Sequence, residues 1–297
     1  MTDGSPALSI GLAVRNGGHG IKRCIQSILS QDFTDLELVV SDNVSDDGTI
    51  ETLESYARVD PRIKLNLNRV NIGSHENMRL VLEASRGTFF RWISHDDWLE
   101  PKCLSTCVRA LDSRRDAIGV TTWFTIHDPD GSTRYEEFRG EFPTSSDPAR
   151  RFERMLWFLH AGDAKYDPIY GMYRRDRLMR AHPLRPSERA DWLLGAELAL
   201  IGPIIHLEER LANRSSSSPV RADPAAFRRR LDPVRAERLR TSPRRQYREM
   251  LALAVSADLT EAQLRRCRWA LRRFWIQEVI RTARLRVAGA RLRMRGR

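Results

Sequence analysis

The first hundred residues repeat one order of apolar positions. Residues 8–16 are rich in apolar residues, as is typical of a strand covered on both faces, and the apolar positions over 21–29 follow at helical spacing. Further strands, with helical segments between them, are predicted at 36–41, 63–67 and 88–93. This order indicates crossover connections and a mainly parallel, Rossmann-like central sheet with helices on both faces, so we expect an α/β fold.

The second half is less regular, but its elements can still be predicted. The expected helices are 104–111, 147–160 and 190–201. The expected strands are 117–126, 132–138 and 203–207. The turn sequence at 128–131 predicts a hairpin between the first two of these strands.

These patterns divide the chain into three parts. Residues 1–214 are expected to form the α/β domain, whose halves are 1–100 and 101–214. A serine-rich stretch ending in proline makes 215–223 a linker, and 224–297 is predicted to be a helical, arginine-rich extension.

Polar residues follow four of the predicted strands. Ligands of parallel sheets bind beyond the carboxyl ends of the strands, so clusters at these positions are expected to meet at one rim. The clusters are Arg15-Asn16, Asp42-Asn43, 71–74 and Asp96-Asp97.

The last cluster carries the clearest chemistry. Asp96 and Asp97 are adjacent carboxylates directly after an apolar strand, and they would destabilise the fold there unless a positive group opposed them. A divalent cation such as Mg²⁺ or Mn²⁺ prefers such oxygen ligands and can hold a diphosphate. Two alternatives remain open: Asp96 caps a helix beginning near Pro101, or both acids face solvent in a turn.

Charge, cysteine content and apolar runs narrow the possible classes of protein and its location. Residues 265–297 contain 12 arginines and one acid, Glu278, so they carry the whole formal net charge of +11. The four cysteines are scattered and are expected to be buried free thiols. No apolar run is long enough to span a bilayer, and residues 1–6 lack a signal pattern, so we expect a cytoplasmic protein or one on the inner face of the cell membrane.

The motifs resemble those of the family 2 glycosyltransferases of the GT-A fold. The resemblance covers about residues 7–212, is strongest before 101, and rests on the order of four motifs. They are Leu-Ala-Val-Arg-Asn (12–16), Ser-Asp-Asn-x-Ser-x-Asp-Gly-Thr (41–49), Asn-Ile-Gly (71–73) and His-Asp-Asp (95–97). It implies a nucleotide-binding first half, an acceptor half, and inverting sugar transfer with a divalent metal.

The resemblance also implies roles for the rim residues. Asp42 would accept a hydrogen bond from the nucleobase, and the alternative is that it only satisfies backbone N–H groups of the 41–47 turn. Asp97 would ligate the metal, and Asp96 would contact the ribose or a metal-bound water. The other expected donor-binding residues are Ala13, Arg15, Asn16, Asn71, Gly73, Ser74 and His95.

Several nearby residues receive structural interpretations instead. Asp46 or Ser45 is expected to cap the following helix. Arg79 and Arg91 are interpreted as helix-surface or ion-pair residues. Gly73 is expected to provide a positive φ or a close backbone approach.

The same resemblance places the catalytic base at Asp191. The alternative is an ordinary acid stabilised by the helix dipole, which would lower its pKa and weaken it as a base. Glu188 is the reserve candidate. One departure from the family is the stretch after Leu211, which lacks the late histidine and offers Arg214 to the diphosphate instead.

The expected partners are a nucleoside-diphosphate sugar and a carbohydrate or lipid-linked acceptor, in bacterial surface polysaccharide or glycolipid synthesis. Residues 163–167 and 170–173 are expected to face the acceptor. The basic tail 265–297 either packs on the domain or contacts an anionic membrane, and nucleic acid ranks below both as a partner. The rival interpretations are a catalytically idle GT-A domain and a nucleic-acid-binding protein.

Overall fold

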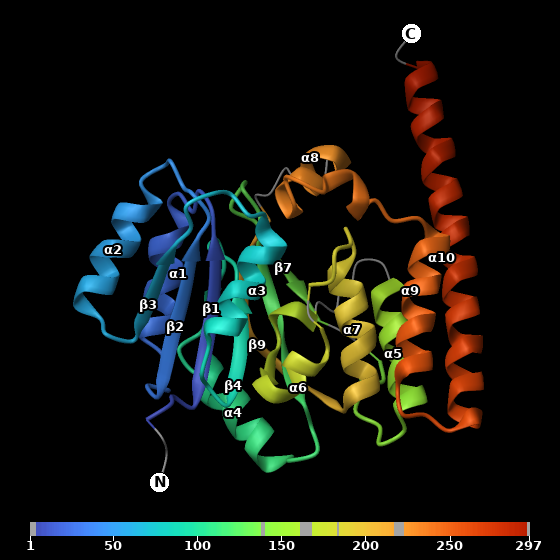
Figure 1. Ribbon diagram of the computed structural model, residues 1–297, viewed down its shortest axis with the longest axis horizontal. Coiled ribbons are helices and arrows are strands. Elements are labelled where there is room, and N and C mark those ends of the chain that lie inside the picture. Colours follow the sequence, from blue (N-terminus) through green and yellow to red (C-terminus); the bar gives the residue numbers. More distant parts are fainter. Residues whose placement is uncertain (1–3, 138–139, 161–167, 183, 217–222, 296–297) are drawn as a thin grey trace.

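A nine-stranded sheet runs through the molecule (Figure 1). The computed structural model describes residues 4–137, 140–160, 168–182, 184–216 and 223–295. The strand order is β3-β2-β1-β4-β8-β6-β9-β5, with β7 paired to β6. The expected α/β class is confirmed.

Four parallel strands form one half of the sheet, and they match the predicted ones closely. They are β1 (Leu8–Val14), β2 (Leu36–Asp42), β3 (Ile63–Leu67) and β4 (Phe89–Ile93). β1 lies between β2 and β4, and every residue of β2 and β4 is buried. The connecting helices are α1 (Gly20–Leu29), α2 (Thr49–Val59) and α3 (Ser74–Ala84). Because these strands run in parallel, their carboxyl ends share one rim.

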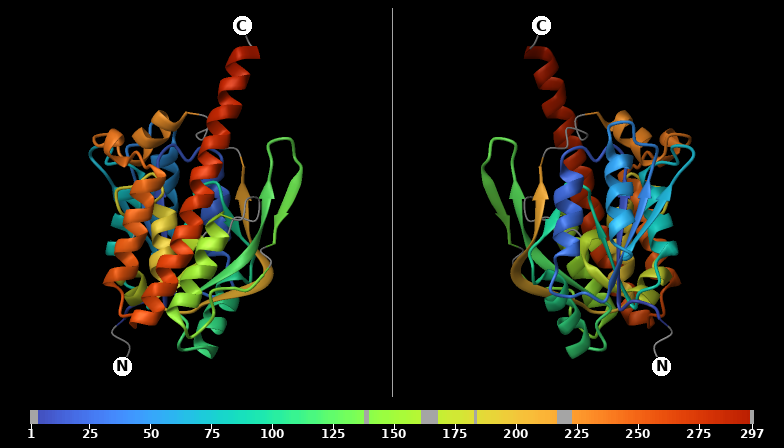
Figure 2. Two further views of the ribbon diagram at one scale, coloured as in Figure 1. Left: turned by 90° about the vertical axis from the view of Figure 1, so that its right-hand side faces the viewer. Right: turned by 90° about the vertical axis from the view of Figure 1, so that its left-hand side faces the viewer.

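The other half of the sheet adds antiparallel pairs. Its strands are β5 (Trp98–Leu99), β6 (Gly119–His127), β7 (Thr133–Glu136), β8 (Met172–Arg174) and β9 (Ile204–Ser215). The predicted hairpin is confirmed as β6–β7, which stands away from the helices in Figure 2. β9 pairs in parallel with the whole of β6, so it continues well beyond the predicted end at residue 207.

Helices of the second half and of the extension pack together (Figure 1). The remaining elements are α4 (Cys103–Ser113), α5 (Pro148–His160), η1 (Pro168–Tyr170), α6 (Arg175–Arg180), α7 (Ala190–Ile201), α8 (Pro224–Leu231), η3 (Ala236–Leu239), α9 (Pro243–Ser256) and α10 (Glu261–Arg295). Side chains of α5, α7, α9 and α10 share a second hydrophobic core, separate from the core around the sheet. The division into domain, linker and extension stays a prediction.

The sequence left open whether the basic tail packs on the domain. In α10, Cys267, Leu271 and Phe274 are buried in the second core, while Arg268 and Arg272 on the same helix are exposed. The tail therefore packs by one face as far as Glu278, and α10 then continues beyond the rest of the molecule (Figure 2). In the described part of the chain, no helix combines the length and apolarity that crossing a membrane requires. The four cysteines are free and buried, as predicted.

We expect Leu271→Ala to lower the free energy of unfolding by about 2–5 kcal/mol, because it leaves a cavity in the second core. Leu271 has 0% of its surface exposed, whereas Ile276 on the same helix is 51% exposed. The matched control Ile276→Ala is expected to change stability by less than about 1 kcal/mol. Urea unfolding of both variants measures the difference, and equal effects would contradict a core shared by α10 and the domain.

Candidate functional site

The candidate site lies at the carboxyl ends of β1, β2 and β4, at the top of Figure 1. Asn77 of α3 connects two of these strand ends. Its Nδ2 donates to the carbonyl oxygen of Ser41 at 2.9 Å and to that of Val14 at 3.4 Å, and it is buried. The sequence analysis missed Asn77, although a polar residue on the inward face of a predicted helix was a usable signal.

Asp42 is the last residue of β2 and is buried. Its Oδ1 accepts the backbone N–H of Ser45 at 2.9 Å, and its Oδ2 accepts the hydroxyl of the same residue. Asp42 therefore does hold the 41–47 turn, as the alternative interpretation stated. Each carboxylate oxygen has two lone pairs, so accepting these bonds leaves capacity for a nucleobase N–H.

The loop after β1 is fastened to the loop after β2. The backbone N–H of Asn16 donates to Ser45 Oγ at 2.8 Å, and the N–H of Gly18 donates to Asp47 Oδ2 at 2.9 Å. Asn16 and Val44 both have positive φ, 55° and 65°, and such strain in a β-branched valine is concentrated at functional sites. Ala13 is half-buried and Arg15 is exposed beside this pair of loops.

The expected cap of α2 was wrong. Its N-cap residue is Gly48 with φ 87°, and neither Ser45 nor Asp46 bonds to the helix. Ser45 and Asp46 instead serve the loop, and Asp47 Oδ1 accepts the backbone N–H of Thr49 at 3.2 Å. The hydroxyl of Thr49, with the N–H of Gly18, lowers the pKa of Asp47.

The 71–74 loop closes the rim beside β2. Asn43 Nδ2 donates to Asn71 Oδ1 at 2.8 Å, and Asn43 Oδ1 accepts the N–H of Ile72 at 2.9 Å. Asn43 thus holds the loop whose Asn71 and Ser74 were expected to face the donor. The sequence placed Asn43 in the motif but gave it no role.

Gly73 meets both expectations stated for it. Its φ is 85°, and a Cβ added there would lie 2.4 Å from the carbonyl oxygen of Leu231 and 2.9 Å from Cα of Asp232. The end of α8 therefore rests directly on the loop.

We expect Gly73→Ala to lower the free energy of unfolding by about 1–3 kcal/mol more than Gly131→Ala, because backbone strain and a clash coincide at Gly73. Gly131 is a matched control with the same φ of 85° and no heavy atom within 4 Å of an added Cβ. Chemical unfolding of both variants isolates the clash. Equal destabilisation would mean that α8 moves aside freely.

The His95-Asp96-Asp97 triplet follows β4 directly. Ser94 Oγ donates to Asp96 Oδ1 at 2.5 Å, and the backbone N–H of Asp97 donates to the carbonyl oxygen of Ser94 at 3.1 Å. Only 8% of Asp97 is exposed, and burial lowers the pKa of His95. Asp96 does not cap the next helix, because α4 begins at Cys103 with Lys102 as its N-cap residue.

The donor set suits a magnesium or manganese ion that arrives with a diphosphate. Such ions bind one or two carboxylates, with phosphate oxygens and water completing the coordination. Asp97 offers a largely buried carboxylate and Asp96 a partly buried one. Over the residues that the structure describes, no group of three metal-ligating side chains gathers by itself.

Asp191 and Glu188 lie on either side of Arg189, the N-cap residue of α7, and differ in what holds them. The carboxylate of Glu188 accepts the backbone N–H of Thr241 at 2.8 Å and a hydrogen bond from Arg228 at 3.3 Å. Glu188 therefore anchors the extension, which weakens it as the reserve base. Asp191 is half-buried in the first turn of α7.

Residues of α10 support the same turn. The guanidinium of Arg189 lies 4.1 Å over the ring of Trp192 and 3.8 Å from Glu278. Glu278 is 2% exposed and is also paired with Arg281 at 2.8 Å. A buried carboxylate of the extension thus fixes the residue that starts the Asp191 helix.

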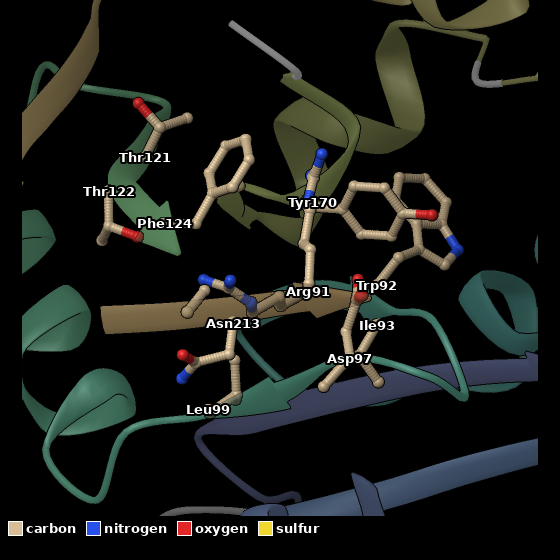
Figure 3. A pocket seen from close by; sticks show the side chains of 13 residues that line it. Arg91, Trp92, Ile93, Asp97, Leu99, Thr121, Thr122, Phe124, Tyr170 and Asn213 are labelled. Carbon is tan, nitrogen blue, oxygen red and sulfur yellow. The ribbon is translucent and has the colours of Figure 1, made fainter. Parts of the chain in front are cut away.

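A pocket beside Asp97 extends between β4, β6 and β9 (Figure 3). Arg214, at the end of β9, places its guanidinium 4.1 Å from the ring centre of Phe124 and 4.4 Å from that of Tyr170. It lines the same pocket as Asp97, and it lies in the stretch after Leu211 that lacks the late histidine of the family. His206 lies apart, with Nδ1 2.9 Å from Thr121 Oγ1 and burial lowering its pKa to about 4.

The interpretation given to Arg79 and Arg91 holds for only one of them. Arg79 is paired with Glu76 and Glu83 on α3, which confirms the ion-pair interpretation. For Arg91 that interpretation was wrong, because Arg91 is buried in β4 and lines the pocket. Of the residues expected to face the acceptor, Tyr170 lines the pocket, while 163–167 lie outside the described residues.

Comparison with known families decides the assignment. The family model described as Glycosyl transferase family 2 matches residues 9–184, more than half of the chain. The chain belongs to glycosyltransferase family 2.

Solved structures confirm the GT-A type of fold for this family 2 chain. The Staphylococcus aureus TarS fragment 1–349 superposes with a TM-score of 0.64 at 18% identity, covering 89% of this chain and 70% of that one. The mannosyltransferase PcManGT from Pyrobaculum calidifontis, in complex with GDP-Man and Mn²⁺, has a TM-score of 0.52 at 17% identity. The superposition covers 98% of this chain and 81% of the PcManGT chain.

Curated relatives of this family 2 chain are longer proteins. A chondroitin synthase of Pasteurella multocida is 26% identical over 165 residues, 53% of this chain and 17% of the relative. A chondroitin synthase of Escherichia coli is 31% identical over 123 residues, 41% of this chain and 17% of the relative. The match thus spans about a sixth of the length of these relatives.

Proposed function

We propose that this chain transfers a sugar, with inversion, from a nucleoside-diphosphate sugar to an acceptor hydroxyl. The observation that carries the proposal is the placement of two buried carboxylates, Asp42 and Asp97, at the carboxyl ends of β2 and β4 on either side of β1. A bound nucleotide needs a hydrogen-bond acceptor for its base at one end and a ligand for the diphosphate-bound cation at the other. Structures of TarS with UDP and with UDP-GlcNAc support a nucleotide-sugar donor for this fold.

Different rim residues bind different parts of the donor. Asp42 accepts the nucleobase N–H, with Ala13, Arg15 and Asn16 over the base. The ribose and the diphosphate lie along Asn71, Gly73, Ser74 and Asp96. His95 orients this side of the site, and burial lowers its pKa.

Asp97 would hold Mg²⁺ or Mn²⁺, and the bound cation would supply positive charge against the leaving diphosphate. Arg214 supplies a second positive charge from β9, in place of the late histidine, and its position between two rings keeps it beside Asp97.

Asp191 acts as the base. It takes the proton from the acceptor hydroxyl while the acceptor oxygen forms a bond to the anomeric carbon and the bond to the diphosphate oxygen breaks. Arg189 holds the first turn of α7 so that Asp191 faces the acceptor. The support is the fixed position of Arg189 between Trp192 and Glu278.

Calorimetric titration with UDP, GDP and dTDP, with and without Mn²⁺, tests the site. One nucleotide is expected to bind in a metal-dependent way, with that dependence lost in Asp97→Ala and kept in the surface control Asp176→Ala. Failure of all three nucleotides to bind would refute the proposal. Binding without transfer to any acceptor would instead favour an idle GT-A domain.

We further propose that the acceptor is a carbohydrate or lipid-linked sugar of bacterial surface polysaccharide or glycolipid synthesis, reached at the inner face of the cell membrane. Trp269, Ile276 and Ile280 are exposed on α10 among the arginines, as on helices that bind anionic bilayers. Flotation with phosphatidylglycerol vesicles, compared with neutral vesicles and with Trp269→Ala, tests the contact. Binding to DNA in place of vesicles would contradict it.

A further inference from the structure

Arg91 is a buried charged residue to which the proposed transfer site assigns no role. It is the third residue of β4, 4% of it is exposed, and β4 lies between β1 and β8 in the sheet. Among the described residues, neither its Nε nor its Nη1 has a hydrogen-bond partner. Buried guanidinium N–H groups without an acceptor destabilise the fold unless an anion reaches the guanidinium.

The pocket that Arg91 lines is the place from which an anion can reach it (Figure 3). The charged side chains lining the pocket are Arg91, Asp97 and Arg214. The proposed transfer site assigns Asp97 to the cation and Arg214 to the diphosphate, which leaves the single positive charge of Arg91. This charge matches one monoanionic group, whereas a phosphate monoester would bring nearly two negative charges.

The pocket has about 20 Å³ of accessible space, so it admits one small group such as a carboxylate, and a sugar ring would lie at its mouth. The rest of the lining suits the hydroxyl groups of such a sugar. Thr121, Thr122 and Asn213 place hydroxyl and amide groups around the pocket, and the ring of Tyr170 forms part of one wall. Threonine hydroxyls both donate and accept, as recognition of sugar hydroxyls requires. The pocket also includes Asp97, so a group bound there lies next to the proposed reaction centre.

We propose that this pocket binds the carboxylate of a sugar acid through Arg91. The planar guanidinium matches a carboxylate with two parallel hydrogen bonds. The proposal rests on the transfer function proposed above and names its substrate class: either the donor sugar or the acceptor sugar is a uronate. Arg91 determines specificity and takes no part in bond formation.

The test compares UDP-glucuronate with UDP-glucose in the presence of Mn²⁺, by calorimetry on the full chain. The variants are Arg91→Met, which keeps length without charge, Arg91→Lys, and the control Arg79→Met on the surface of α3. In the wild type and the control, we expect UDP-glucuronate to bind about 10- to 100-fold more tightly. Arg91→Met should abolish this preference and leave UDP binding unchanged, and Arg91→Lys should keep part of it.

A second arm identifies an acceptor-borne carboxylate. If the donors bind equally, glucuronate is titrated against glucose with UDP and Mn²⁺ present, and an Arg91-dependent preference for glucuronate supports the site. If glycerol phosphate binds through Arg91 and glucuronate does not, the carboxylate assignment is overturned.

Two outcomes separate this proposal from the transfer function. Metal-dependent UDP binding with no Arg91-dependent preference in either arm would overturn the carboxylate site alone. Loss of UDP binding in the wild type would overturn both proposals. Thermal unfolding without ligand adds an independent readout: Arg91→Met should be at least as stable as the wild type, and a large loss of stability would mean that the charge has a structural role.

Discussion

Asp97→Ala is expected to lower kcat for sugar transfer by about 1,000-fold or more. Asp97 is the largely buried carboxylate at the end of β4, and its loss removes the proposed cation ligand at the leaving diphosphate. A metal ion stabilises such a transition state by several kcal/mol, and each 1.36 kcal/mol corresponds to a factor of ten in rate. Steady-state transfer assays at saturating donor measure the effect.

The matched comparison is Asp96→Ala, one residue away. Asp96 already accepts a hydrogen bond from Ser94 and is assigned to the ribose or to a metal-bound water, so its loss should reduce kcat less than that of Asp97. Excess Mn²⁺ should not fully restore the activity of either variant. An Asp97→Ala enzyme within tenfold of wild-type kcat would remove the metal ligand from the proposed mechanism.

Asp191→Asn is expected to lower kcat by about 100- to 10,000-fold, the range for loss of a general base. Asparagine keeps the size and the hydrogen-bonding shape of the side chain, so donor KM should change little. The acidic limb of the pH–rate profile should also disappear, because the group that must be ionised is gone. Transfer assays across pH, with donor binding measured separately, check each part.

Glu188→Gln is the control for this experiment. The Glu188 carboxylate binds the Thr241 N–H and Arg228, so its neutralisation should lower the midpoint of thermal unfolding more than it lowers kcat. The reverse pattern, with kcat lost in Glu188→Gln and kept in Asp191→Asn, would assign the base to Glu188.

Where a segment is long and mostly apolar, the sequence predicted the fold well. The buried strands β1, β2 and β4 and the helix α7 are such segments, and their predicted bounds fall within about two residues of the observed ones. By contrast, β5 and β8 contain two and three residues, too few to show a period. They form because β9 and β4 offer unpaired edges, which is a tertiary effect.

The candidate site, too, could be predicted from the sequence only in part. The ends of β1, β2 and β4 could be brought together from the sequence, since parallel strands place their carboxyl ends at one rim. Arg91 could not, because a charged residue within an apolar strand does not reveal whether it faces a helix, a partner or a pocket. The anchoring role of Glu188 also depends on Thr241, 53 residues away, and no local pattern reports such a contact.

The extension meets the domain at two separate places. The backbone at the end of α8 rests on Gly73 in the 71–74 loop, and Glu278 of α10 holds Arg189 at the start of α7. We therefore expect a movement of this loop to displace α8, from which the chain continues to α10 and the support of Arg189. Under the proposed function, this link predicts a compulsory order of addition in initial-rate kinetics, with donor before acceptor.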